Sequence, residues 1–374
     1  MDYCGGSWLE LGREALKGNV EAVKAGTGCG SPIAVVKADA YGHGLEGMAR
    51  ELRAAGVRRF AVAYVAEGAE VRRAVPDAEL IFLLGRAGSG DVAALRTWGI
   101  TAAVVDAGHA EELSAAAVAD GGGALPVHVK FDTGMGRLGF TWPEKREEAL
   151  KAARLPGLDV TGACMHFAKV EPESDPQWAA RQHAKFAEAA GALEASLGRK
   201  IFKHSSATRA ALLLPEAGWD AVRVGISLYG YETAGVAGGR FETRPVMQWK
   251  TRVVQVKRVP AGFFAGYDGT WRAERETVLA TLSVGYADGY RRSFGNRADV
   301  LLGGRRCRVA GRVSMNWLIV DAGPDADVRV GDEAVLMGEQ GGEAVWADEL
   351  AGLDGTISYE ILTGLSRQLE RRWV

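Results

Sequence analysis

Residues 32–44 read PIAVVKADAYGHG. A short apolar run, residues 33–36, ends on Lys37, and a tyrosine, a histidine and two glycines follow it. Burying a lysine side chain costs several kcal/mol unless the amine is paired, neutralised or used chemically. The simplest explanation is a strand that ends where its side chains meet water. The rest of the chain decides between this explanation and a functional lysine.

The same pattern, a short β-rich run followed by a longer segment with helical spacing, recurs through the first two thirds of the chain. Nearly continuous apolar strands are typical of a parallel sheet that is buried on both faces. About eight β–α units over some 230 residues favour a closed (β/α)8 barrel. A doubly wound open sheet is the alternative, although no G-x-G-x-x-G follows the first strand. The predicted strands are 32–37, 59–64, 79–84, 101–105, 126–131, 159–166, 200–205 and 221–230.

Beyond about residue 240 the chain changes in character. β-rich runs separated by glycine and proline predict a mostly antiparallel β domain. An amphipathic helix is expected only near the end, over 357–373. We therefore divide the chain into a barrel domain, residues 1–240, and a C-terminal β domain, residues 241–374.

The composition excludes several classes of function. The 374-residue chain is 47% hydrophobic and 25% charged with a net charge of −2, so it lacks the basic surface expected for binding nucleic acid or an anionic membrane. We find neither an apolar stretch long enough to cross a bilayer nor a signal peptide, and we expect a cytoplasmic protein. The cysteines Cys4, Cys29, Cys164 and Cys307 and the six histidines show no metal-ligand spacing, so we expect no metal site.

Polar residues follow several predicted barrel strands, where the active sites of such barrels lie. Lys37 ends the first strand, Arg137 lies in DTGMGRLG after the fifth, and His166 ends the sixth. Ser205 and Ser206 end the seventh strand and Gly225 lies in the eighth, and the two hydroxyls and the free amides around Gly225 suit a phosphate group. A lysine that faces a phosphate site suggests a Schiff base with pyridoxal phosphate.

The segments VVKADAYGHG, KFDTGMGRLG, VRVGISLYG, VGYADGY and TISY, with the opening SWLELGREALKGN, resemble in this order the motifs of alanine racemases. The resemblance covers nearly the whole chain. It implies a fold-type III pyridoxal phosphate enzyme, with a barrel, a β domain and a homodimer whose active sites are shared. It also implies interconversion of L- and D-alanine by a two-base mechanism, which supplies D-alanine for peptidoglycan.

The resemblance implies roles for the earlier motifs. Lys37 matches the cofactor lysine, which also serves as one base, and Tyr41 matches a phosphate-binding tyrosine. Arg137 matches an arginine near the cofactor's phenolic oxygen and the substrate carboxylate. Lys130 matches a lysine that is carbamylated in many members, since a second cation close by favours its neutral amine. An ion pair with Asp132 is the alternative for Lys130.

Later barrel residues complete the implied cofactor site. His166 matches a histidine beside the pyridine ring, and Ser205, Gly225 and Ile226 match phosphate-binding positions. Arg223 matches the arginine that hydrogen-bonds the pyridine nitrogen. Because a guanidinium is always charged, it donates only to an unprotonated nitrogen, which should make transamination rare.

The β domain is expected to complete the site of the partner subunit. Tyr267 in GYDGTW matches the second catalytic base, although the usual form of the motif is Y-G-x-T. Tyr286 resembles a residue of the substrate entrance, and Met315 resembles the residue whose amide meets the substrate carboxylate. Tyr359 in TISY resembles a tyrosine at the phosphate and substrate pocket.

Three positions depart from the commonest motifs. His204 stands where Asn usually precedes the serine of strand seven, and Ser314 and Asn316 replace a usual Cys and Asp. Asn316 removes a negative charge near the substrate carboxylate, and His204 is expected to add a titrating group beside the phosphate. A racemase of broader range, acting on serine or other amino acids, is therefore an alternative.

Other functions fit less well. A fold-type III decarboxylase would favour an acidic partner for the ring nitrogen instead of Arg223. A non-catalytic cofactor-binding relative would lack the β domain that contains Tyr267. A barrel hydrolase without a cofactor would show no visible absorbance band.

Overall fold

The computed structural model describes residues 6–170, 175, 177–231 and 242–374. The chain forms two compact units, which we describe separately. The barrel unit comprises Leu16–Ala40 and Leu45–Thr243, and the β unit comprises Met1–Ala15, Tyr41–Gly44 and Arg244–Val374.

The described part of the barrel unit holds eight parallel strands that close on themselves. Two sheets, in the orders β10-β2-β3-β4 and β5-β6-β8-β9, are joined on both sides by the single bridges Phe82–Thr101 and Ala207–Arg223. The predicted (β/α)8 barrel is therefore confirmed. Its strands are β2 (Ile33–Val35), β3 (Arg59–Val62), β4 (Leu80–Leu83), β5 (Ala102–Val104), β6 (Leu125–Asp132), β8 (Leu158–Cys164), β9 (Phe202–His204) and β10 (Arg223–Val224).

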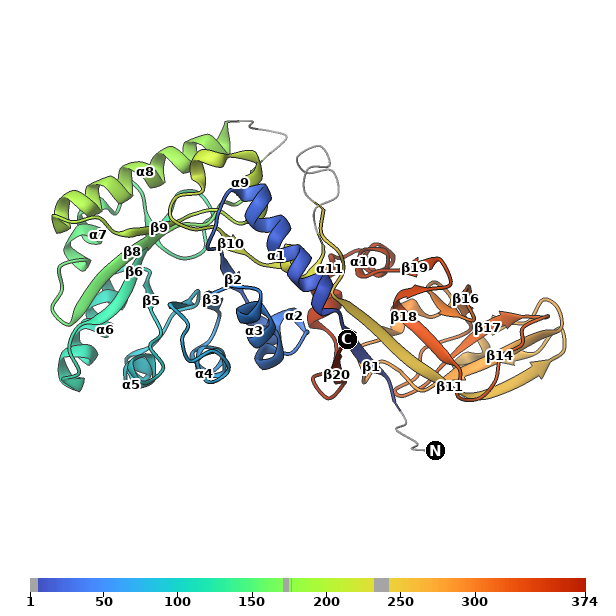
Figure 1. The fold of residues 1–374 in the computed structure, drawn as a ribbon. Helices are drawn as coiled ribbons and strands as arrows, with labels where there is room; N and C mark the ends of the chain where they lie inside the picture. The colour runs from blue at the N-terminus through green and yellow to red at the C-terminus, as the bar shows by residue number, and fades with distance from the viewer. Residues whose placement is uncertain (1–5, 171–174, 176, 232–241) are drawn as a thin grey trace. The chain divides into compact units, whose positions relative to one another are not determined.

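Helices follow these strands and lie outside them (Figure 1). Their apolar residues recur every three or four positions and form one buried stripe. In α3 (Leu45–Ala54), for example, the stripe consists of Leu45, Met48, Ala49 and Leu52. The others in this unit include α4 (Val65–Ala74), α5 (Val92–Thr97), α6 (Ala107–Asp120), α7 (Arg146–Ala152), α8 (Trp178–Leu197) and α9 (Thr208–Leu213).

The β unit is built on one large sheet, in the order β19-β18-β15-β16-β17-β14-β11-β1-β20. An additional pairing of β11 with β18 closes six antiparallel strands into a ring, which leaves no free edge along them. The predicted antiparallel character is confirmed. The strands are β1 (Trp8–Leu11), β11 (Met247–Val259), β14 (Thr277–Leu282), β15 (Asp299–Leu302), β16 (Arg305–Val309), β17 (Leu318–Gly323), β18 (Glu333–Gln340), β19 (Glu343–Val345) and β20 (Glu370–Trp373), with the short hairpin β12 (Phe264–Ala265) and β13 (Trp271–Arg272).

Both chain ends differ from the expectation. The first residues belong to the β unit, not to the barrel as the division at residue 240 assumed, because β1 pairs antiparallel with β11. The helix predicted over 357–373 is confirmed only for its first part, Ser358–Thr363, and is wrong beyond it. Two short helices, α10 (Ala347–Asp354) and α11 (Ser358–Thr363), precede a final strand, because β20 pairs in parallel with β1.

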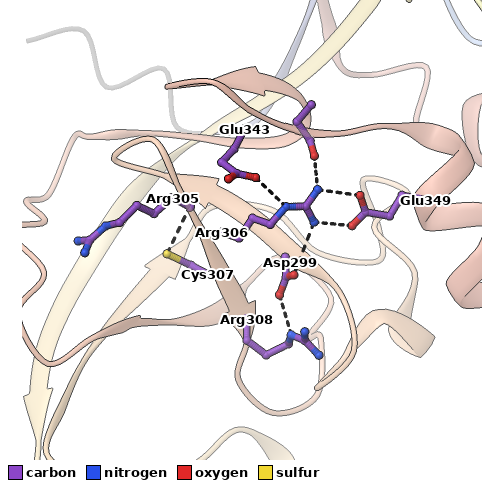
Figure 2. Close-up of polar contacts among 8 residues, drawn as sticks. Asp299, Arg305, Arg306, Cys307, Arg308, Glu343 and Glu349 are labelled. Atoms are coloured by element: carbon purple, nitrogen blue, oxygen red, sulfur yellow. Dashed lines mark hydrogen bonds and ion pairs between the residues drawn. The ribbon is translucent and has the colours of Figure 1, made fainter.

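Arg306 links four elements of the β unit (Figure 2). From β16 its guanidinium contacts Glu343 of β19 at 3.1 Å and Glu349 of α10 at 2.7 and 2.9 Å. A third carboxylate, Asp299 of β15, lies 3.6 Å from it and also accepts a hydrogen bond of 2.6 Å from Arg308. The network fastens α10 to the sheet.

Within the residues described, no helix is long and apolar enough to cross a membrane. Cys29, Cys164 and Cys307 are free thiols, and Cys4 lies outside the described residues.

Candidate active site

Predicted cofactor residues of the barrel unit lie at the C-terminal ends of its strands, and Arg223, at the start of β10, reaches the ends of β8 and β9 through hydrogen bonds to the carbonyls of Met165, His204 and Ser205. Lys37 follows β2, Arg137 follows β6, His166 follows β8, and Arg223 opens β10, which is hydrogen-bonded to β2. Because parallel strands end at the same rim of a barrel, these side chains converge there. Burial lowers the pKa of His166, and the nearby charges of Arg223, Arg137 and Lys37 lower it further.

Lys37 begins a turn of left-handed helix, the segment labelled α2 (Lys37–Tyr41) in Figure 1. Residues 38–41 have φ between 52° and 56°, and the Ala40 amide donates to the Val36 carbonyl at 2.9 Å. Each non-glycine residue in this conformation costs about 1–2 kcal/mol. Contacts with the surrounding protein must offset that cost.

The amine of Lys37 is partly buried between charges of both signs. Burial lowers its pKa, Arg137 lowers it further, and the Glu67 carboxylate opposes both effects. The neutral amine that a base requires therefore forms at a lower pH on Lys37 than on an exposed lysine.

Arg223 is 5% exposed and its terminal nitrogens are committed to the protein. Nη1 donates to Nδ1 of His204 at 2.8 Å and to its carbonyl at 2.7 Å. Nη2 donates to the carbonyls of Met165 at 2.6 Å and Ser205 at 2.8 Å, and Nδ1 of His166 lies 3.3 Å away. Among the described residues, Nε–H is the guanidinium donor with no protein acceptor.

This guanidinium sets the protonation of a chain of histidines. Since Arg223 can only donate, Nδ1 of His204 must accept, and Nε2 of His204 then donates to Nδ1 of His128 at 2.9 Å. Burial and then Arg223 lower the pKa values of His128 and His166 to about 3, and that of His204 falls well below its ordinary value for the same reasons. The expectation that His204 adds a titrating group is therefore wrong: it is buried and neutral.

The His128 ring fits only because the facing strand has a glycine. A Cβ on Gly162 of β8 would lie 2.6 Å from Cδ2 and Nε2 of His128 and 2.6 Å from the Phe202 carbonyl. On its other side the ring stacks on Phe82, with centroids 5.0 Å apart. The His128 ring is therefore held by packing on both of its sides as well as by its hydrogen bond to His204.

Asp132 shapes the loop that carries Arg137. Its Oδ1 accepts hydrogen bonds of 2.9–3.1 Å from the amides of residues 134–136, and Oδ2 accepts one of 3.0 Å from the Arg137 amide. The ion pair between Lys130 and Asp132 is not present. Lys130 is 7% exposed, and across the described residues its amine has no hydrogen-bond or ion-pair partner. Burial lowers the pKa of Lys130, with smaller contributions in the same direction from two arginines.

The predicted phosphate-binding residues differ in whether they have a free hydrogen-bond donor for a phosphate oxygen. The Ser205 hydroxyl donates its one proton to the Ala217 carbonyl at 2.8 Å, so it has none left for a phosphate oxygen. The amides of Gly225 and Ile226 make no backbone hydrogen bond in the described structure and remain suitable donors. Thr208, which the sequence analysis did not single out, is a buried residue at the first position of α9, just after strand seven.

In the β unit, three predicted residues lie on adjoining loops. Tyr267, between β12 and β13, is 67% exposed, Tyr286 is 43% exposed and Met315 is 56% exposed. The Tyr286 amide donates to the Ser314 carbonyl at 3.0 Å, which places the second loop beside the third. Asp268 contacts Arg312 at 3.0 Å, which fastens the Tyr267 loop to the same segment.

Tyr41 and Tyr359 also meet in the β unit. Their ring centroids are 5.8 Å apart, with Tyr359 contributed by α11. A Cβ on the neighbouring Gly42 would lie 2.2 Å from the Leu362 carbonyl, so this approach of the two segments requires the glycine.

Comparison with known proteins gives a consistent result. Residues 12–233 match the family model "Alanine racemase, N-terminal domain", and residues 246–373 match "Alanine racemase, C-terminal domain". A curated alanine racemase from Symbiobacterium thermophilum is 39% identical over 368 residues, 98% of this chain and 96% of the relative. The alanine racemase of Clostridium difficile 630 superposes with a TM-score of 0.91 at 32% identity, covering 99% and 96% of the two chains. The alanine racemase of Bartonella henselae, solved with covalently bound pyridoxal phosphate, has a TM-score of 0.86 at 25% identity, covering 99% and 100%.

Proposed function

The chain belongs to the alanine racemase family and is an isomerase that interconverts L- and D-alanine; we propose that it holds pyridoxal phosphate on Lys37 and uses Lys37 and Tyr267 as its two bases. The observation on which the proposal rests most is Arg223. Among the residues described, Nε–H is the one donor of this buried guanidinium that has no protein acceptor, and at the rim where Lys37 lies it suits an unprotonated pyridine nitrogen.

The other residues at the rim fit the same group. The amides of Gly225 and Ile226 and the hydroxyl of Thr208 would donate to its phosphate, and Tyr41 stays a prediction for that role. When bound, pyridoxal phosphate supplies the electron withdrawal that acidifies the Cα–H bond of an amino acid. A solved relative contains this cofactor, which supports its assignment here.

Racemisation requires proton transfer at the substrate Cα on two opposite faces. Lys37, with its pKa lowered chiefly by burial, would take or return the proton on one face. The Tyr267 hydroxyl would do so on the other face, with Arg137 and the Met315 amide holding the substrate carboxylate. The Asp132-bound loop already fixes the backbone at Arg137, so little backbone reorganisation is needed when substrate binds.

We further propose a homodimer in which the loops with Tyr267, Tyr286 and Met315 complete the partner's site. All three side chains are more than 40% exposed although two are aromatic and one is a thioether. Exposed aromatic and methionine side chains gathered on one surface are typical of an interface. The cytoplasmic location stays a prediction from the sequence.

Lys130 is proposed to carry a carbamate. Its neutral amine would add carbon dioxide to form an N–C bond and release one proton to solvent, leaving an anion that can pair with Arg137. The buried, unpartnered amine supports this, because a neutral or anionic group there avoids an uncompensated buried cation.

Two measurements test the proposed function. Chiral analysis of single L-amino acids incubated with the protein should show D-alanine accumulating first, and carbon dioxide release in its place would indicate a decarboxylase. A D-enantiomer formed equally well from serine would favour the broader-range racemase, the alternative that Asn316 raised in the sequence. Borohydride should fix the cofactor on the Lys37 peptide, and label on another lysine would overturn the assignment.

A further inference from the structure

Glu67 fastens two strand ends of the barrel with one carboxylate. It is the third residue of α4 and is 8% exposed. Its Oε1 accepts a hydrogen bond of 2.7 Å from the amide of Ala38, just after β2. Its Oε2 accepts hydrogen bonds of 2.8 Å from Ala63 and 3.2 Å from Tyr64, just after β3. Charged acceptors of amide protons make the stronger class of hydrogen bonds.

The bond to Ala38 lies at the first residue of the left-handed turn. Inside the turn, the Ala40 amide donates to the Val36 carbonyl, and the Asp39 carboxylate accepts from the amide of Leu45, beyond the end of the turn, at 2.9 Å. Glu67 contributes the contact from a different β–α unit. Because a left-handed run of non-glycine residues is unfavourable by itself, this outside contact orients the peptide that joins Lys37 to the turn.

Glu67 also contributes the negative charge that acts on Lys37. Two other groups interact electrostatically with this amine: Arg137, which is cationic, and His166, which is held neutral by burial and by Arg223. The Glu67 carboxylate therefore offsets the repulsion that Arg137 exerts on the Lys37 ammonium.

We propose that Glu67 is the positioning residue of Lys37, holding the left-handed turn in place and balancing the charge of Arg137. This inference rests on the proposed role of Lys37. The role proposed for Glu67 concerns the backbone at Lys37 and the charge beside it, so its effects can be measured in the protein without cofactor.

The test compares wild type with Glu67→Gln, Glu67→Ala and Glu67→Asp in cofactor-free protein. Trace acetylation of Lys37, followed by mass spectrometry across pH, reports the pH midpoint of its amine. We expect this midpoint to fall in the Gln and Ala variants, which lose the carboxylate charge, and to stay near wild type in the Asp variant. Pyridoxal phosphate should bind about tenfold more weakly or worse to all three, because none can reach both strand ends with two charged acceptors.

Glu112→Gln is the matched control. Its carboxylate also accepts a backbone hydrogen bond, from Ser89 at 2.8 Å, and pairs with Arg86, but it does not act on Lys37. A wild-type midpoint and cofactor affinity in Glu67→Gln would overturn the proposal. Should the Gln and Ala variants fail to fold, the Asp variant decides: weakened cofactor binding supports the proposal and unchanged binding overturns it. Borohydride label outside Lys37 in wild type would instead overturn the proposed function, while the midpoints still decide the role of Glu67.

Discussion

Replacing Lys130 by methionine should stabilise the cofactor-free protein. Methionine is an unbranched side chain one atom shorter than lysine, and it has no charge. Lys130 is 7% exposed and has no partner among the described residues, so its ammonium form bears a desolvation penalty that methionine lacks. Near pH 7 we expect the free energy of unfolding to rise by about 1–3 kcal/mol, the cost of leaving a buried polar group unpaired.

The pH dependence follows from the lowered pKa of Lys130. The penalty is complete below the folded-state pKa and is lost as the pH rises toward the unfolded-state value of about 10.4. The advantage of Lys130→Met should therefore shrink with rising pH. Bicarbonate should also narrow the difference, because a carbamate formed in the native state stabilises the wild type by mass action and cannot form on methionine.

Urea unfolding of both proteins, in degassed and in bicarbonate-containing buffer, measures these differences. Lys250→Met is the control, since Lys250 is a partly buried lysine with partners: Glu10 at 2.8 Å and Glu333 at 3.1 Å. That variant should lose stability and should respond to bicarbonate as wild type does. A Lys130→Met protein that is less stable than wild type in degassed buffer would refute the reasoning, as would an equal response of both proteins to bicarbonate.

Three further predictions concern other parts of the molecule. Lys37→Ala and Tyr267→Ala should each abolish most racemisation. After subunit exchange, a mixture of the two variants should regain about a quarter of wild-type activity, since about half the dimers are hybrids and each hybrid has one intact site. Subunit exchange without recovery of activity would place both residues in one subunit's site. Gly162→Ala should lower the free energy of unfolding in urea by about 1–3 kcal/mol because its Cβ would overlap a buried imidazole. The control Gly191→Ala, which has open space around it in α8, should raise the free energy of unfolding by up to about 1 kcal/mol, and equal effects of the two substitutions would contradict the packing argument. Arg306→Met should cost about 1–2 kcal/mol, and the loss should diminish in about 1 M salt because its carboxylate partners are partly exposed; a salt-independent loss measured by the same unfolding assay would point to packing instead of charge.

The barrel could be predicted because its strands are short apolar runs buried on both faces, and helical segments separate them. The position of Lys37 at a rim followed from the same pattern. The left-handed turn could not be predicted: residues 38–41 include two alanines, which favour right-handed helix, and the turn depends on Glu67, 29 residues away from Ala38 in the sequence.

Two other differences have the same kind of cause. The polar ending ERRW is a strand because it pairs with β1 at the other end of the chain, and no local pattern contains that information. The role of Ser205 depends on where its one proton points, which is set by the Ala217 carbonyl. Residue type and spacing identify candidates, whereas the direction of a single hydrogen bond decides which of them can act.

The buried histidines around Arg223 have a consequence for how the activity of the enzyme depends on pH. Histidine is ordinarily the side chain that changes charge close to neutral pH. Here the pKa values of His128 and His166 are about 3, and the pKa of His204 is also well below its ordinary value. All three imidazoles therefore remain uncharged at physiological pH. Protonation of these three imidazoles therefore does not account for a loss of turnover on mild acidification, and they serve as a scaffold of fixed hydrogen-bond polarity.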